Sequence, residues 1–396
     1  MRIKMFKLSK MKRAIYITSL LAALVIIFTG CEKKYTSEDD SRIVYYVDIS
    51  LEKGDNEVIR SIVLKYLKAL GQVGYLTCGL DEEKDTMGLV TAQESLATIS
   101  PSLFLSVEVN ARIFGRLITL YGTADQKSQF LDDLKKGRLI GAVALSEGGM
   151  NIENDPLRTG GERVGENYFV NGEKNHVVNA PIADWIAVAG KVEENIVFFV
   201  IKKDTEGLSI GQRISTMGYN GCAISAISLE NCSMHSKYVI GPFEGDEPLK
   251  ALRMWEDKIL TAGSLGLMQR CYKNALSYAK SHKSGNKPII AYQEVGFKLA
   301  EMLTLLQTAQ LLAYRAAWMA ETNNKEAGVG ARCAKVFCTE AAEEVASQAL
   351  QILGGYGYID GNPAEEGYRN AKYLQIAGTS TEISRMKIAD GVLQMN

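Results

Sequence analysis

Histidine and proline are scarce in this chain, and neither sign of charge dominates. Three of the 396 residues are histidine, seven are proline, and 45 basic residues stand against 46 acidic ones, which gives a net charge of -1. A chain so balanced has no overall field that would attract a polyanion, so we expect no nucleic-acid partner. The hydrophobic fraction of 46% is that of ordinary globular protein, and the length predicts two or three domains with packed cores.

Metal-ligand spacing is also missing from the sequence. The seven cysteines form no C-x-x-C pair, and the three histidines, at 176, 235 and 282, lie far apart. These patterns exclude the usual zinc motifs, and we predict no metal site. The cysteines from Cys78 onward are expected to be reduced and mostly buried thiols rather than disulfides.

Residues 1–31 differ in character from all that follow. A basic stretch precedes an uncharged, mostly apolar run over residues 14–29, and the segment closes at Cys31. This layout is typical of a bacterial lipoprotein signal, and a run of this length is marginal for spanning a hydrocarbon core of about 30 Å. We therefore expect association with a membrane through this segment. The alternatives are an uncleaved anchor, or a cytoplasmic protein whose translation starts later, at Met5 or Met11.

Hydrophobic periodicity predicts a helical domain after a short tether. Residues 32–54 are polar and charged and are interpreted as the tether. Over residues 55–138 apolar side chains recur at helical spacing, so we expect one face of each helix to be buried against its neighbours. The predicted helices cover residues 56–74, 87–99 and 102–121, with Ser100-Pro101 as a stop and restart, and a short helix ends at Leu134.

The period changes after residue 138. Short runs rich in β-branched and aromatic residues predict a small middle β domain over residues 139–246, and Asn171-Gly172 is interpreted as a turn between strands. Helical spacing returns over residues 247–396 and predicts a C-terminal four-helix bundle. The fold class is therefore α+β. The expected strands lie at 139–145, 168–170, 185–189 and 196–201, and the expected bundle helices at 249–320, 328–353 and 380–394.

The order of these domains, and several motifs inside them, resemble the acyl-CoA dehydrogenase superfamily. The resemblance covers roughly residues 58–396 and is clearest from Gly115 onward, while the family's first helix has no counterpart. The motifs that carry it are Leu120-Tyr121-Gly122-Thr123, residues 137–147, Asn171-Gly172-Glu173-Lys174, Ala262-Gly263-Ser264-Leu265-Gly266-Leu267, residues 297–302, Gln351-Ile352-Leu353-Gly354-Gly355-Tyr356-Gly357-Tyr358 and Tyr368-Arg369-Asn370-Ala371-Lys372.

This resemblance implies a reaction, a cofactor and partners. In such enzymes a carboxylate removes the α-proton of an acyl-CoA thioester, FAD takes the β-hydride, and an electron-transferring flavoprotein accepts the electrons. The fold also implies assembly through the C-terminal bundle, either as a homo-oligomer or with a paired acyl-CoA dehydrogenase subunit. The residues to find are the base and those that hold the flavin.

The resemblance implies an unusual position for the base. Much of the family carries it just before a Gly-Thr pair, but here Ala377 precedes Gly378-Thr379, and neither Ala377 nor Gly378 has a carboxylate. A branch that includes isovaleryl-CoA dehydrogenase carries the base on the first bundle helix instead. Counting back from the motif at 262–267 leads to Glu256 in this sequence.

Glu256 could act as a general base if its carboxylate lay in an apolar slot, because burial raises the pKa of a carboxyl group toward neutrality. Asp257 stands where that branch has arginine, and a second like charge should raise the pKa of one of the two acids. The alternative is that both residues belong to a solvated, charged first turn of the helix.

The implied FAD contacts on the β domain are Ser146, His176 and Val178. Ser146 keeps a hydroxyl, whereas Val178 and Ile152 replace hydroxyl-bearing residues and cannot hydrogen-bond the flavin. His176 replaces a tryptophan, and it could either stack on a ring or make an ordinary hydrogen bond in a strand.

On the bundle, His282 replaces an arginine that meets the FAD of a neighbouring subunit, so that Lys283 or Lys287 would have to substitute for the lost cation. The implied adenine and pyrophosphate contacts that remain are Gln351, Gly354, Gly355, Thr379 and Ser380. The paired glycines have an alternative explanation, since a helix end and close packing also favour glycine.

Two functions of different classes are open from the sequence. One is an FAD-dependent acyl-CoA dehydrogenase-like oxidoreductase, favoured by Glu256 and the retained pyrophosphate contacts. The other is a flavin-poor, catalytically degenerate partner subunit of an acyl-CoA dehydrogenase complex, which could be anchored to a membrane; the substituted residues Val178 and His282 favour it. Export would conflict with CoA chemistry unless the substrate is not linked to CoA.

Overall fold

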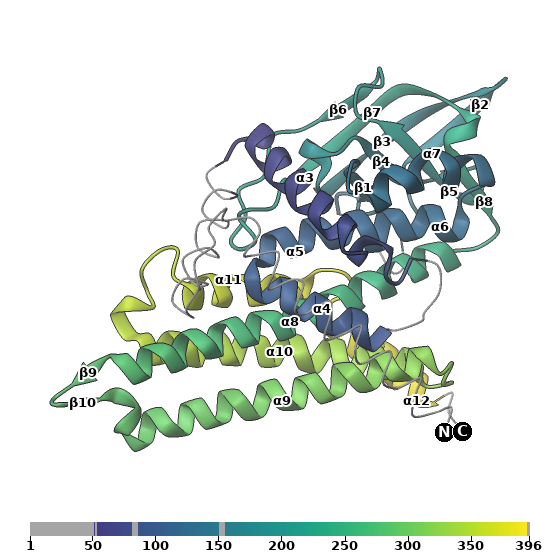
Figure 1. Ribbon diagram of the computed structural model, residues 1–396. Coiled ribbons are helices and arrows are strands. Elements are labelled where there is room, and N and C mark those ends of the chain that lie inside the picture. Colours follow the sequence, from purple (N-terminus) through teal and green to yellow (C-terminus); the bar gives the residue numbers. More distant parts are fainter. Residues whose placement is uncertain (1–50, 52–53, 81–85, 150–154, 394–396) are drawn as a thin grey trace.

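The computed structural model describes residue 51 and residues 54–80, 86–149 and 155–393 (Figure 1). The predicted membrane segment, nearly all of the predicted tether, and Ile152 lie outside these residues. Helices, a sheet and a helical bundle follow one another along the chain, in the predicted order (Figure 1). The predicted α+β architecture is therefore confirmed.

The first region consists of helices whose starts are fixed by capping side chains. Helix α3 begins after Asp55, whose carboxylate accepts hydrogen bonds from the N–H groups of Glu57 and Val58. Helix α5 begins after Ser100, as the Ser-Pro restart predicts, and the Ser100 hydroxyl accepts the N–H of Leu103. The elements are α3 (Asn56–Gln72), α4 (Thr86–Ile99), α5 (Pro101–Glu108), η2 (Val109–Gly115), α6 (Arg116–Tyr121) and α7 (Ala124–Lys135).

The segment 102–121, predicted as a single helix, changes its winding in the middle. Helix α5 passes into the π-helical element η2 and then into α6. Such π-helical turns are uncommon and frequently occur next to functional sites. Here η2 also connects the helices to the sheet, because Oδ1 of Asn110 accepts the N–H of Gly141 at 2.7 Å.

The second region is an eight-stranded sheet in the order β6-β7-β3-β2-β4-β5-β8, with β1 parallel to β4. Arg60 of α3 forms an ion pair of 2.6 Å with Asp184 beside the sheet, and Gln126 of α7 donates to the carbonyl oxygens of Lys237 and Val239. These contacts hold the first helices beside the sheet (Figure 1). The strands are β1 (Gly141–Ala144), β2 (Gly160–Val164), β3 (Asn167–Val178), β4 (Trp185–Val192), β5 (Asn195–Lys202), β6 (Leu208–Ile210), β7 (Ile224–His235) and β8 (Val239–Phe243).

The prediction of a turn at Asn171-Gly172 is wrong, because both residues lie inside β3. The pairing of β3 with β7 shifts its register between Val170 and Gly172, which marks a bulge. Gly172 has a φ of 152°, and a β-carbon built there would lie 2.4 Å from Oγ1 of Thr159. The glycine is therefore required by close packing in a strand, not by a hairpin.

The third region is a bundle of long helices packed around α10 (Figure 1). The stretch 249–320, predicted as continuous helix, is divided into α8 and α9 by a two-stranded hairpin, β9 (Lys283–Ser284) and β10 (Lys287–Pro288). The helices are α8 (Glu247–Ser281), α9 (Gln293–Glu321), α10 (Ala327–Leu353), α11 (Pro363–Ile376) and the shorter α12 (Thr381–Leu393).

Two apolar cores stabilise the molecule. One joins the first helices to the sheet, and the other fills the bundle. Within the described residues the cysteines are free thiols, as expected, and four of the six are buried. None of the described helices is long and apolar enough to cross a bilayer.

Candidate active site

The predicted base lies against the loop that follows α11. Gly378 in this loop has a φ of 63°, and a β-carbon built on it would lie 3.4 Å from Cγ of Glu256 and 2.6 Å from Oδ1 of Asp257. Gly378 is one of the two positions considered for the usual base of the family. Glu256 is the position on the first bundle helix that the isovaleryl-CoA dehydrogenase branch uses. These two positions therefore lie next to each other. Here the loop supplies space and Glu256 supplies the carboxylate.

Asp257 and Lys335 hold the same loop by its backbone. Oδ1 of Asp257 accepts the N–H of Thr379 at 2.8 Å, and Nζ of Lys335 donates to the carbonyl oxygen of Ala377 at 2.9 Å. The Lys335 ammonium lies 3.7 Å from Oδ1 of Asp257, and its side chain is 0% exposed. Ser380 then starts α12, because its hydroxyl accepts the N–H of Ile383.

Burial changes the protonation of this cluster. Loss of solvent, followed by repulsion from Asp257, raises the pKa of Glu256 to about 7, although Lys335 and Arg253 oppose the rise. The pKa of Asp257 is also raised by burial, and burial lowers that of Lys335. Glu256 follows Glu247, the first residue of α8, by nine residues, and Asp257 is buried, so these two acids do not form a solvated first turn of the helix.

Aromatic side chains form another wall beside Glu256. Burial, followed by repulsion from Glu256, raises the pKa of Tyr373 well above its usual range, so the phenol stays neutral and close to the acid. The ring of Tyr373 lies 4.8 Å from that of Tyr219, measured between centroids. Gly263, about two turns further along α8, leaves space for Phe104, whose ring would clash with any β-carbon at that position.

The β-domain residues predicted to contact FAD lie around the end of β1 and a second register shift in β3, between Lys174 and Val177. Ser146 and His176 are exposed, while Val178 is half-buried and packs on the bundle core. Glu147, the residue after Ser146, forms a buried ion pair, because Nζ of Lys174 lies 2.7 Å from its Oε1. Glu147 also accepts the N–H groups of residues 158 and 159. Burial alone would raise the pKa of Glu147. The hydrogen bonds, followed by the charge of Lys174, outweigh that effect and lower the pKa of Glu147 to about 2.

The remaining predicted contacts lie at the other end of the bundle. His282 follows α8 directly, and its ring stacks on Tyr278 at 4.6 Å and meets Tyr356 at 5.9 Å. Gln351 and the two glycines after α10 are exposed. No atom lies within 4 Å of a β-carbon built at Gly354 or Gly355.

The structure therefore separates the predicted residues into two groups. His282 follows Glu256 by 26 residues, which along a helix is about 39 Å. Glu256, Thr379 and Ser380 come together at one end of α8, and His282, Gln351 and the glycine pair at the other. One dinucleotide cannot bridge that separation, so a single chain does not bring both groups to the same flavin.

The residues present fit a bound FAD with two losses. Close packing does not explain Gly355, because nothing fills the space beside it, whereas Gly354, with a φ of 56°, also ends α10 in a conformation that favours glycine. A surface kept clear in this way suits a ligand that approaches the backbone. The losses are the hydroxyl at Val178 and the fixed cation at His282.

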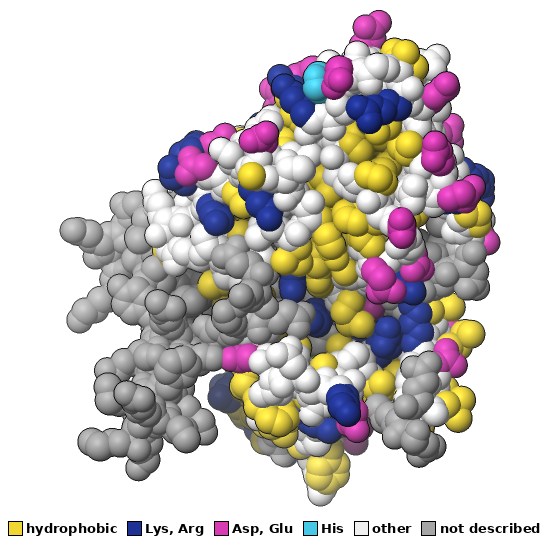
Figure 2. Space-filling view, turned by 90° about the vertical axis from the view of Figure 1, so that its right-hand side faces the viewer, with side chains coloured by type: hydrophobic (Ala, Val, Ile, Leu, Met, Phe, Trp, Pro, Cys, Tyr) yellow, Lys and Arg dark blue, Asp and Glu magenta, His cyan; other side chains and the backbone are white. Residues whose placement is uncertain are grey.

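Two cavities adjoin the first group. A cavity of about 670 Å³ is bordered by Asp257 and Thr379 and is otherwise rich in basic side chains. Figure 2 shows Lys and Arg gathered at the level of the bundle on the face that it presents. The basic residues that line the cavity are Lys250, Arg253, Lys325, Arg332 and Lys387, and the further acidic ones are Glu326 and Asp390.

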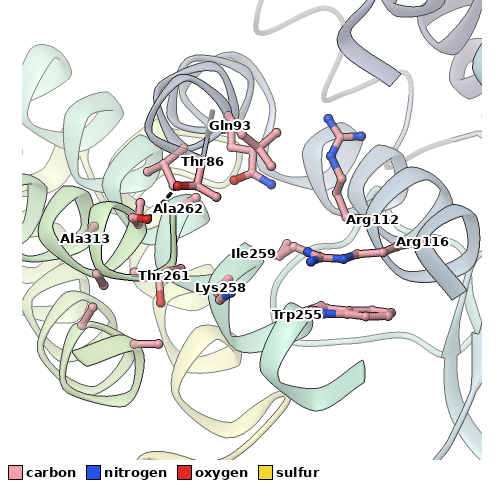
Figure 3. Close-up of a pocket in the computed structure, with 17 residues that line it drawn as sticks. Thr86, Gln93, Arg112, Arg116, Trp255, Lys258, Ile259, Thr261, Ala262 and Ala313 are labelled. Atoms are coloured by element: carbon pink, nitrogen blue, oxygen red, sulfur yellow. Dashed lines mark hydrogen bonds between the residues drawn. The ribbon is translucent and has the colours of Figure 1, made fainter. Parts of the chain in front are cut away.

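The second cavity is small, about 70 Å³, and lies between α4, α8, α9 and α10 (Figure 3). Alanines line much of it, and the guanidinium of Arg116 lies 4.6 Å above the ring of Trp255 at its edge (Figure 3). Glu256 does not line this cavity. Glu256 does not line the larger cavity either, although its neighbour Asp257 does.

Lys335 belongs to the charged cluster of the candidate site but was not predicted from the sequence. It occupies a buried position in α10 among Ala331, Ala334 and Cys338, at the spacing of a core-facing helical stripe. A lysine inside an otherwise apolar stripe is rarely buried without a charged partner. That signal was available in the sequence, but the partner, Asp257, is 78 residues away.

Comparison with known family models gives one consistent answer. Models of the N-terminal, middle and C-terminal domains of acyl-CoA dehydrogenase match residues 52–138, 142–232 and 255–393. Together these matches cover most of the chain. They coincide with the helical region, the sheet and the bundle.

Individual proteins agree with the family models. A 3-(aryl)acrylate reductase of Clostridium sporogenes (strain ATCC 15579) is 32% identical over 340 residues, which are 83% of this chain and 90% of that protein. Mitochondrial isovaleryl-CoA dehydrogenase of Oryza sativa subsp. japonica is 31% identical over 320 residues, 78% of each chain. The fold matches that of butyryl-CoA dehydrogenase from Megasphaera elsdenii with a TM-score of 0.76 at 22% identity, over 92% of this chain and 100% of that one. Solved structures of the same fold include an FAD-dependent dehydrogenase.

Proposed function

Because this chain belongs to the acyl-CoA dehydrogenase family and is an oxidoreductase of that type, we propose that it binds FAD and transfers hydrogen at the α and β carbons of an acyl thioester, with Glu256 as the base. The observation that carries this proposal is the position of Glu256, a half-buried residue of α8 whose side chain lies beside the loop at Gly378. A carboxylate in that place can take a weakly acidic proton near neutral pH.

The chain's own residues account for the proton part of the reaction. The α C–H bond breaks, its proton moves to a carboxylate oxygen of Glu256, and the electron pair stays with the substrate to form the new double bond. Bound FAD supplies the acceptor for the hydride that leaves the β carbon. The neutral phenol of Tyr373 lies near the acid, and the ring of Tyr219 packs against that of Tyr373; such partial burial keeps the proton affinity of Glu256 high.

The flavin would be held by two surfaces of the protein. On the β domain the contact residues would be Ser146, His176 and Val178, near the Glu147–Lys174 ion pair. Thr379 and Ser380 lie on the bundle of the same chain. The second group would approach the flavin of another chain, and it consists of His282, Gln351, Gly354 and Gly355.

The large basic cavity supports a substrate carried on a phosphate-bearing thioester such as CoA. It opens beside Asp257 and Thr379, next to the base, and five basic side chains line it. Phosphate groups are attracted to such a cluster of Lys and Arg. The similar protein of C. sporogenes is named for 3-arylacrylates, so aryl thioesters belong among the substrates to be tested.

Self-association through the bundle, or pairing with a related subunit, would bring the two groups together. Helix α9 carries large apolar side chains on its outer face: Phe297 is 61% exposed, Leu311 71% and Trp318 51%. An apolar face of this kind on a helical bundle favours association. An electron-transferring flavoprotein is the proposed acceptor of the electrons.

We also propose that residues 1–31 attach the protein to a membrane, on the strength of the basic stretch, the apolar run and Cys31. Two acyl chains anchor a protein firmly, whereas one binds weakly. The full-length protein should fractionate with membranes, and a Cys31→Ser form should move to the soluble fraction. Equal solubility of the two forms would favour a later start and a cytoplasmic protein.

The experiment that tests the function begins with the absorbance spectrum of the purified protein, which reports bound flavin directly. Rapid mixing with a panel of straight-chain, branched and aryl acyl-CoA thioesters should then bleach the flavin band with at least one of them. A colourless protein that does not take up added FAD would support the partner-subunit function, which the substitutions at Val178 and His282 favour. Bound flavin that no thioester reduces would direct the search to acids not linked to CoA.

A further inference from the structure

The loop at residues 377–379 is held from both sides by buried charges. Asp257 binds the N–H of Thr379, Lys335 binds the carbonyl of Ala377, and the two charged groups lie 3.7 Å from each other. Gly378 is fixed between these two bonds, against the side chain of Glu256. The charged pair therefore determines where the backbone passes beneath the base.

Stability alone does not explain such a pair. Replacing a buried ion pair by apolar side chains of similar size is often neutral or even stabilising, because both charges lose their hydration when they are buried. Lys335 occupies a position in α10 where the neighbouring buried residues are alanines, Cys338 and Thr339, none of them charged. An apolar side chain would complete that stripe, so the charge calls for an explanation in the site.

The charges around Glu256 come from every helix that packs against it. Asp257 adds a like charge, and Lys335 brings the opposite charge. Because Lys335 is paired with Asp257, the negative charge of Asp257 partly offsets the effect of the Lys335 ammonium on Glu256. The titratable and charged groups that face this cluster are Arg253 and Asp257 of α8, Lys335 of α10, Tyr373 of α11 and Lys387 of α12.

We propose that Asp257 and Lys335 are a positioning pair for Glu256: they fix the backbone of residues 377–379 beneath the acid, and Asp257 holds the Lys335 ammonium away from it, so that Glu256 stays basic enough to take a proton. The inference rests on the proposed role of Glu256 as the base. It assigns separate roles to the two partners. Lys335 supplies charge and a bond to Ala377, and Asp257 supplies charge and a bond to Thr379.

Three variants separate these roles. Asp257→Asn removes the like charge but keeps an oxygen that can accept the N–H of Thr379, whereas Asp257→Ala removes both. Lys335→Met removes the cation at similar length. The titration of Glu256 can be followed in the full-length protein by infrared spectroscopy with ¹³C-labelled glutamate, where the band lost in Glu256→Gln identifies this acid without any turnover.

The pair predicts opposite shifts of that titration. The midpoint of Glu256 should fall by about one pH unit in Asp257→Asn and rise by about one unit in Lys335→Met. The double variant should lie between the two, and Lys335→Arg should stay near the parent. The proposed electrostatic role of the pair would be overturned if the titration midpoint of Glu256 did not change, or if it shifted in the same direction in both single variants.

The bonds to the loop need a second readout. Hydrogen exchange at residues 377–379, measured by mass spectrometry, should be at least about tenfold faster in Asp257→Ala than in Asp257→Asn. Equal exchange in both would overturn the positioning part, and this comparison still decides if Lys335→Met does not fold. If the midpoints shift as predicted but Glu256→Gln reduces its flavin as fast as the parent, the pair stands and the base assignment fails.

Discussion

The two ends of α8 place their functional residues in opposite ways. At the first end Glu256, Asp257 and Lys335 are packed against each other and against a fixed loop, and every contact is made within one chain. At the second end His282 stacks on Tyr278, and the exposed glycines after α10 touch nothing beside their α-carbons. The first group is packed within the described residues of one chain, whereas the glycines of the second group are exposed.

This difference indicates which parts of the reaction need an assembly. Proton removal depends on burial and on neighbouring charges, and one chain provides both. Under the proposed function, the two surfaces that hold one flavin lie about 39 Å apart on a single chain, so they must come from two chains. Loss of assembly should therefore affect flavin retention, while the acid keeps its raised proton affinity.

The largest expected effect is at the first end. Glu256→Gln keeps shape and polarity but removes the proton acceptor, so flavin reduction by an active thioester should slow by roughly 10² to 10⁴. Flavin content should not change, because the second end is untouched. Glu247→Gln, an exposed acid on the same helix, is the matched control and should behave as the parent. An equal effect of both substitutions would remove the distinction between the two ends.

Assembly gives the next effect. Leu311→Glu places a charge in the exposed apolar face of α9, and we expect it to weaken association by at least about 2 kcal/mol, roughly thirtyfold. Sedimentation should show smaller species, and the dissociated protein should lose FAD more readily. Val164→Glu, at an exposed apolar residue of the β domain, is the control. If Leu311→Glu remains assembled, another face joins the chains.

Two glycine substitutions sharpen the comparison. Gly378→Ala would force a side chain into a left-handed backbone and against Asp257, and should lower the free energy of unfolding by about 2–3 kcal/mol. Gly355→Ala meets no atom within 4 Å and should change it by less than about 0.5 kcal/mol, yet weaken FAD binding. Denaturant unfolding and flavin titration measure the two quantities. A destabilised Gly355→Ala protein would mean that its glycine serves packing after all.

The smallest effect is a dependence of stability on pH. The pKa of Glu256 is raised to about 7 by burial, above the value of about 4.3 for a free glutamate. Between these values the folded chain retains a proton that the unfolded chain has released, so stability falls as pH rises from about 4 to 7. Glu256→Gln removes this loss. The free energy of unfolding of the variant minus that of the parent should therefore be about 1 kcal/mol larger at pH 8 than at pH 5, a value that includes a reduction because Glu256 is partly exposed. Denaturant curves at the two pH values test this, and a constant difference would contradict it.

Sequence reasoning found the elements whose period is long and regular. Helices α3, α4 and α10 bury one face over several turns, and their apolar spacing predicts them closely. Strand β2 was not predicted because its five residues are mostly exposed and carry no alternation. Asn171-Gly172 was misread because the hairpin signal and a bulge use the same residues, and only the neighbouring Thr159 distinguishes them.

In the site, too, contacts between residues far apart in the sequence could not be predicted. The resemblance led to Glu256, because a count along the chain is enough to place it. The pairing of Asp257 with Lys335, and the separation of Thr379 from Gln351, depend on which helices meet. No count along the sequence gives those contacts, because they are set by the packing of α8, α10 and α11.

Helix α8 runs without interruption from Glu247 to Ser281, and this continuity limits how its length can change. One inserted residue between Glu256 and His282 would rotate the two ends by about 100° relative to each other and move them about 1.5 Å further apart. The base would then point away from the loop at Gly378, or the aromatic stack at His282 would leave its place. Insertions and deletions in this stretch should therefore be tolerated only near whole multiples of the helical turn, whatever residues are used to make them.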